Sequence, residues 1–136
     1  MTPTLVDSSA FLAIEDPSER SHSRATSALR KLVAARTKLL TTNFIFDETY
    51  TLILTRLGRR RAVEWGKAFK SGNLVQLVRV QEEHETFAWE ILMTFADKDF
   101  SYTDATSFAL AESLEFEQAF AVDDHFRQYG RIRVVP

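Results

Sequence analysis

Short apolar runs alternate along the chain with longer segments in which apolar side chains recur every three or four residues. The short runs are typical of buried strands, and the longer segments have helical periodicity. The predicted strands are 4–6, 39–41, 74–80, 119–122 and 132–135. The predicted helices are 8–14, 17–36, 43–57, 59–69, 82–96 and 101–114, with a short helix before the last strand. This alternation, without hairpin signals, predicts an α/β fold in which α-helices flank a central, mainly parallel β-sheet.

Two of the predicted strands end in an acidic residue. Asp7 follows the first strand, and Asp123 follows the run 119–122. In an open parallel sheet, ligands bind outside the carboxyl ends of the strands, because loops and helix N-termini converge there. The two carboxylates therefore predict one shared site.

Two further acids lie on predicted helices. Glu48 has helical spacing from the apolar residues Phe44 and Leu52, whereas Asp47 points toward solvent. Burying an ionised carboxylate without a partner is very unfavourable, so Glu48 predicts a bound cation or another compensating partner. Asp104 follows Ser101 at capping-box spacing, where an acid also stabilises the helix dipole.

Composition excludes several classes of protein and site. The net charge of -2 provides no bulk attraction to nucleic acid, although a bound divalent cation would reverse the sign of a local acidic cluster. The absence of cysteine excludes disulfides, a thiol nucleophile and a thiolate metal site. No apolar run could span a bilayer, and a strand begins close to Met1, so we expect one cytoplasmic domain over 1–136 with no membrane partner.

Other site chemistries have little support. The chain lacks GxxxxGK[ST], GxGxxG and GxSxG segments, so no organic cofactor site is expected. His22, His84 and His125 share no ligand spacing and are expected to be surface or packing residues. The arginines within 56–61 leave two interpretations open, a contact with RNA or a protein partner and a solvated helix end.

The four acids Asp7, Glu48, Asp104 and Asp123 form a set of hard oxygen ligands. Such a set suits magnesium or manganese better than zinc or copper. One or two such ions support in-line phosphoryl displacement by water.

These motifs, in this order, resemble the PIN domain and, more narrowly, the VapC toxins of type II toxin–antitoxin modules. The residues that carry the resemblance are Val6-Asp7-Ser8-Ser9, Glu48, the segment 101–105 and the segment 121–126. The resemblance covers nearly the whole chain. It implies a single PIN-like domain that acts as a Mg²⁺- or Mn²⁺-dependent endoribonuclease.

The resemblance also assigns roles to residues. Asp7, Glu48, Asp104 and Asp123 would bind the metal and act in catalysis, and Ser9 would support the first acid. Asp124 directly follows the fourth acid and is expected at most to assist it, and Asp97 and Asp99 are left outside the site.

The same resemblance implies three partners, namely an RNA substrate, a cognate antitoxin and a second copy in a homodimer. The helical hairpin 56–69 is the candidate antitoxin contact. Two alternatives stay open, a non-toxin PIN nuclease in RNA processing and a catalytically weak PIN-fold module that binds RNA or protein.

Overall fold

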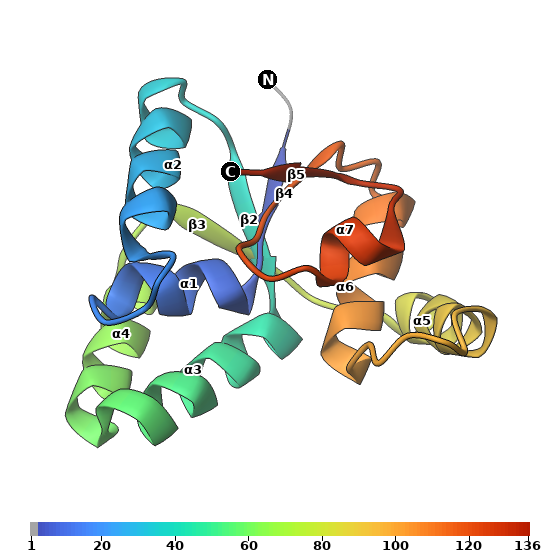
Figure 1. The fold of residues 1–136 in the computed structure, drawn as a ribbon, viewed down its shortest axis with the longest axis horizontal. Helices are drawn as coiled ribbons and strands as arrows, with labels where there is room; N and C mark the ends of the chain where they lie inside the picture. Colours follow the sequence, from blue (N-terminus) through green and yellow to red (C-terminus); the bar gives the residue numbers. More distant parts are fainter. Residues whose placement is uncertain (1–2) are drawn as a thin grey trace.

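The computed structural model describes residues 3–136, which form one parallel sheet with helices on both sides (Figure 1). The strands are β1 (Thr4–Val6), β2 (Leu39–Thr42), β3 (Val75–Val78), β4 (Gln118–Phe120) and β5 (Arg133–Val135). The helices are α1 (Ser8–Glu15), α2 (His22–Ala34), α3 (Asn43–Leu57), α4 (Arg59–Ser71), α5 (Glu82–Thr94), α6 (Tyr102–Ser113) and α7 (His125–Tyr129). All strand pairs are parallel, which confirms the predicted α/β fold.

The strand order β3-β2-β1-β4-β5 creates a switch point beside β1. The chain moves outward from β1 to β2 and β3, and then returns to add β4 and β5 on the other side of β1. Helices α1 to α4 lie to one side in Figure 1, and α5 to α7 lie to the other. A crevice forms where the connections leave in opposite directions, so the ends of β1 and β4 are the expected ligand position.

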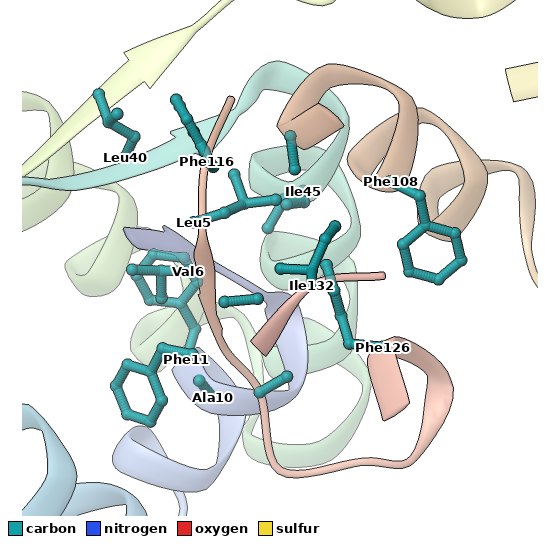
Figure 2. Close-up of a cluster of buried hydrophobic side chains, with 14 of the residues drawn as sticks. Leu5, Val6, Ala10, Phe11, Leu40, Ile45, Phe108, Phe116, Phe126 and Ile132 are labelled. Atoms are coloured by element: carbon teal, nitrogen blue, oxygen red, sulfur yellow. The ribbon is translucent and has the colours of Figure 1, made fainter. Parts of the chain in front are cut away.

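The core is continuous from the sheet into the helices on both faces (Figure 2). Leu5 of β1 and Ile45 of α3 are fully buried. On the α6 side, the Phe108 ring stacks on Tyr129 at a centroid distance of 4.3 Å and meets the Phe126 ring edge-on at 4.9 Å. This aromatic cluster fixes α6 and α7 against each other.

The predicted start of the second helix at Asp16-Pro17 is wrong, because α2 begins at His22. The Asp16 carboxylate instead accepts hydrogen bonds from the Ser18 backbone N–H and hydroxyl, at 2.9 and 2.7 Å. Such local side-chain bonds compete with helix formation and hold the chain in a turn. The helix also ends before Arg36, which adopts a left-handed φ of 56°.

The cap of α3 differs from the prediction as well. Thr42, rather than Asn43, accepts the Ile45 backbone N–H, at 3.0 Å. β3 ends at Val78, so the predicted strand 74–80 is too long. Beyond the strand end, the Val80 backbone N–H donates to the Asn43 side-chain oxygen at 2.8 Å. Gly58 separates α3 from α4 as expected, with a φ of 92° that L-residues rarely adopt.

Candidate active site

The four predicted acids come from four different elements and surround the carboxyl ends of β1 and β4. Asp7 directly follows β1 and is the N-cap of α1. Asp104 lies in the first turn of α6, and Glu48 lies within α3. Asp123 lies in the loop between β4 and α7, because β4 ends at Phe120 rather than at the predicted residue 122.

Ser9 connects the ends of the two central strands. Its hydroxyl donates to Asp7 Oδ2 at 2.6 Å and accepts the Val122 backbone N–H at 3.1 Å. The Ser9 backbone N–H also donates to Asp7 Oδ2, at 3.2 Å. Ser9 therefore fixes the first acid relative to the loop that carries the fourth, which is the geometry that a supporting role requires.

Glu48 is half-buried, and its carboxylate accepts a short hydrogen bond from the hydroxyl of Ser8. Ser8 is the first residue of α1, so this bond ties α3 to the end of β1. Asp47 is exposed, as predicted. The sequence did not assign a role to Ser8, and the contact across 40 positions carries no local signal.

His125 is part of the acid site, so its prediction as a surface or packing residue is wrong. Its Nδ1 lies 2.8 Å from Asp104 Oδ2 and 3.8 Å from Asp123 Oδ2, and its backbone N–H donates to Asp123 Oδ1 at 3.3 Å. With Nδ1 protonated, the ring donates to Asp104 while the backbone N–H donates to Asp123, so His125 holds two acids in place. One sequence signal could have assigned His125 to the site. It is the first residue of a helix that closely follows an acid at a strand end.

The other two histidines have structural roles. The Gln81 backbone N–H donates to His84 Nδ1 at 2.9 Å, which completes the capping box of α5. His22 Nδ1 lies 2.7 Å from the Ala13 carbonyl oxygen, which links α2 to α1. Both belong to the packing class that the sequence predicts.

Burial and repulsion between carboxylates raise the pKa values of Asp7, Glu48 and Asp104. Burial, followed by repulsion from Asp123, raises the pKa of Asp7 to about 8, even though the Ser9 hydroxyl opposes this shift. Burial also raises the pKa of Glu48, against the Ser8 hydrogen bond. The pKa of Asp104 is raised by burial as well, although the Ser101 N–H and His125 counteract it. A cation in this crevice would relieve all three penalties.

The residues present fit a partly hydrated hard cation. Within residues 3–136, no three acidic or histidine side chains are close enough to enclose an ion by themselves. Mg²⁺ retains several waters and takes only one or two carboxylates directly, so it does not require a closed protein cage. The buried carboxylate of Asp7, repelled by Asp104 and Asp123, supplies the charge that such an ion neutralises.

Asp124 and the arginine hairpin lie apart from these contacts. The Asp124 side chain is exposed, and in the described part of the chain it makes no hydrogen bond or ion pair with the other acids. Arg56 pairs with Glu19, Arg60 faces Glu64, and Arg61 donates to the Glu15 carbonyl. These contacts within the chain favour the interpretation of the hairpin arginines as a helix end.

Comparison with known proteins agrees with the fold. The PIN domain family model matches residues 4–132. The 23S rRNA-specific endonuclease VapC20 of Mycobacterium tuberculosis is 31% identical over 132 residues, which cover 96% of this chain and 97% of the relative. The helices within residues 3–136 include none long and apolar enough to cross a membrane.

Solved structures extend the similarity. The crystal structure of M. tuberculosis VapC20, described as a sarcin–ricin loop cleaving toxin, matches with a TM-score of 0.85 and 30% identity, over 98% of this chain and 99% of that one. FitAcB from Neisseria gonorrhoeae shares the fold at a TM-score of 0.73 and 12% identity, over 98% and 96% of the two chains. The protein therefore belongs to the PIN domain family and, within it, to the VapC group.

Proposed function

We propose that this protein is a metal-dependent endoribonuclease and the toxin of a toxin–antitoxin pair. The observation that carries the proposal is the convergence of Asp7, Glu48, Asp104 and Asp123 at the switch point of the sheet. Ionising the buried Asp7, whose pKa is about 8, destabilises the folded state, and a cation bound by a nuclease would offset that destabilisation. The similar protein VapC20 is described as a 23S rRNA-specific endonuclease and a sarcin–ricin loop cleaving toxin, so ribosomal RNA is the first substrate class to test.

The chain's own residues supply position and charge. Asp7, Glu48, Asp104 and Asp123 would hold Mg²⁺ or Mn²⁺, one or two of them directly and the others through bound water. The ion when bound would polarise water and neutralise charge on a phosphodiester. Ser9 fixes Asp7, Ser8 fixes Glu48, and His125 fixes Asp104 and Asp123. These supporting contacts keep the acids aligned when the RNA arrives.

The nuclease proposal is tested by incubating purified protein with ribosomal RNA and mixed RNA in Mg²⁺, Mn²⁺ or EDTA. We expect cleavage in at least one metal and none in EDTA. Asp104→Asn keeps an oxygen that can cap the Ser101 N–H but removes the charge, so it should reduce cleavage at least about 10³-fold without unfolding α6. Cleavage that persists in EDTA, or that Asp104→Asn retains, would contradict the carboxylate mechanism.

An apolar groove of about 450 Å³ offers the antitoxin a place to bind. It lies between α1, α2, α4 and the sheet, and its wall includes Phe11, Trp65, Ala68 and Leu74. The side chains of Ala68 and Leu74 are exposed, so the groove is open to a partner. We propose that an apolar helix of the antitoxin fills it, which places the contact on the inner face of the hairpin 56–69 and on α1.

Replacing Ala68 by Glu is expected to weaken antitoxin binding by about 100-fold, because a charge would be buried against apolar side chains. The measurement is titration of each variant with the cognate antitoxin. Leu114→Glu, an exposed position at the end of α6, is the matched control and should bind normally. Loss of binding in Leu114→Glu alone would place the antitoxin elsewhere.

The homodimer stays a prediction. Trp89 and Met93 lie one turn apart on α5, and each is 57% exposed, so they are apolar side chains that a contact between two copies would cover.

A further inference from the structure

A second cleft lies beside the edge strand β3, outside the cluster of acids. Its volume is about 420 Å³, and it is bounded by β3, the start of α3 and the end of α4. The residues that matter for its chemistry are Asn43, Phe46, Phe69, Lys70 and Arg79. None of its described lining residues is an aspartate or a glutamate, so the cleft is cationic within a chain of net negative charge.

Among the residues that the structure describes, the two cations of this cleft have no acidic partner. Arg56, Arg60 and Arg131 each lie within 4 Å of a glutamate, whereas neither Lys70 nor Arg79 forms an ion pair within residues 3–136. Both side chains are exposed. The Lys70 ammonium lies 5.2 Å from the centre of the Phe46 ring, a cation–π contact that holds it at the cleft wall.

The Asn43 side chain adds a neutral hydrogen-bond donor to the two cations of the cleft. The side-chain oxygen of Asn43 accepts the Val80 backbone N–H at 2.8 Å, which leaves the amide NH₂ of Asn43 as a donor at the cleft. The rings of Phe46 and Phe69 pack edge-on at 5.2 Å and provide an apolar wall. Cations, an amide donor and aromatic carbon together suit a nucleic-acid backbone with an adjoining base or sugar.

The cleft opens at the same edge of the sheet as the acids. Arg79 follows the carboxyl end of β3, and Asp7 follows the carboxyl end of β1, two strands away. Neighbouring strands are about 4.8 Å apart, so the two chain positions are separated by roughly 10 Å across the sheet. This span is short enough for phosphates of one RNA strand to contact both the cleft and the acid site.

We propose that the cleft of Lys70, Arg79 and Asn43 binds backbone phosphate of the RNA substrate a few nucleotides from the bond that is cut. The proposal rests on the proposed nuclease function and assigns the cleft as its anchoring subsite. It explains how a chain with an acidic catalytic crevice holds a polyanion. The crevice itself repels the strand until a metal is bound, whereas this cleft attracts the strand at all times.

The test compares two double variants that remove the same charge. Lys70→Gln with Arg79→Gln alters the cleft. Arg36→Gln with Lys38→Gln is the matched control, because these exposed cations line a separate hollow at the opposite, amino edge of the sheet. Steady-state cleavage of the RNA that the wild-type protein cuts is measured at several salt concentrations.

We expect the cleft variant to raise KM about tenfold at low salt and to leave kcat within about twofold, since the contact binds ground state and transition state equally. The negative slope of log(1/KM) against log[salt] should become shallower by about 1.4, the contribution of two phosphate contacts on a single strand. The control pair should keep the wild-type KM and slope.

Two results would overturn the proposal, and they are distinguishable. Equal KM values and slopes for both double variants, with cleavage intact, would remove the subsite and leave the nuclease standing. Failure of the wild-type protein to cut any RNA in any metal would remove the nuclease proposal and the subsite with it. A circular dichroism spectrum and unfolding midpoint matching wild type exclude a folding defect in either variant.

Discussion

Asp7→Asn is expected to reduce the rate of RNA cleavage at least about 10³-fold. The same substitution is expected to stabilise the metal-free protein at pH 8. The loss of activity follows because the amide cannot supply the negative charge that a cation in the crevice requires. The gain in stability follows because the carboxylate is buried, only 2% exposed, and repelled by Asp123 and Asp104. An amide of the same shape avoids both penalties.

The sign of the pH dependence follows from the pKa of Asp7, which is about 8 in the folded protein and 3.8 for an ordinary aspartate. Between these values the folded state binds one more proton than the unfolded state, so the free energy of unfolding falls as pH rises. The raised pKa values of Glu48 and Asp104 act in the same direction. Because a tenfold change in proton affinity corresponds to about 1.4 kcal/mol, the total loss of stability is on the order of a few kcal/mol.

Thermal unfolding in EDTA at a series of pH values measures this effect. The wild-type midpoint should fall between about pH 4 and pH 8, and the midpoint of Asp7→Asn should fall less, leaving the variant roughly 10 °C more stable at pH 8. Asp124→Asn, which removes an exposed acid near the crevice, should change neither midpoint nor cleavage rate appreciably. A metal-free Asp7→Asn protein that is less stable than wild type at pH 8 would show that the buried carboxylate does not destabilise the fold.

Phe108→Ala is expected to lower the free energy of unfolding by about 3–5 kcal/mol, the usual cost of emptying a buried aromatic position. Phe108 is fully buried and contacts the rings of Phe100, Phe126 and Tyr129 at 4.9, 4.9 and 4.3 Å. The substitution therefore removes the centre of the cluster that holds α6 and α7. Since these helices carry Asp104 and His125, we also expect cleavage to fail at lower temperature than in the wild type.

Urea unfolding measures the loss. Leu114→Ala is the control, because it truncates a large apolar side chain that is 45% exposed, and it should cost less than about 1 kcal/mol. Equal losses for the two substitutions would mean that the aromatic cluster is not the main support of α6.

Local patterns predicted the features that depend on a few neighbouring residues. The acids that follow β1 and β4 could be located because a short apolar run ending in an aspartate is a pattern of a few neighbouring residues, and because the chain contains it twice. The capping box of Ser101 and Asp104 formed as predicted, with Asp104 Oδ2 accepting the Ser101 N–H at 3.0 Å. The side of α3 on which Glu48 lies also followed from helical spacing.

Features that depend on distant or competing contacts were not accessible in this way. The contact of His125 with Asp104 requires α7 to pack against α6, which no local pattern encodes. The start of α2 was misplaced because Asp16-Pro17 suits both a helix start and a turn, and the Ser18 hydroxyl decided in favour of the turn. The cleft beside β3 combines side chains from three elements and had no signal in the chain order.

The pairing of β1 with β4 has a consequence for the order of events during synthesis. Thr4 pairs with Gln118 in the sheet, and the Gln118 side-chain amide donates to the Thr4 hydroxyl at 2.9 Å. The Ser9 hydroxyl accepts a hydrogen bond from the Val122 backbone N–H. These bonds close a loop of more than a hundred residues, so they form only after β4 has left the ribosome. A nascent chain that stops before β4 lacks the fourth acid and the partner that orients Ser9. The four-acid site therefore cannot assemble until nearly the whole chain has been made.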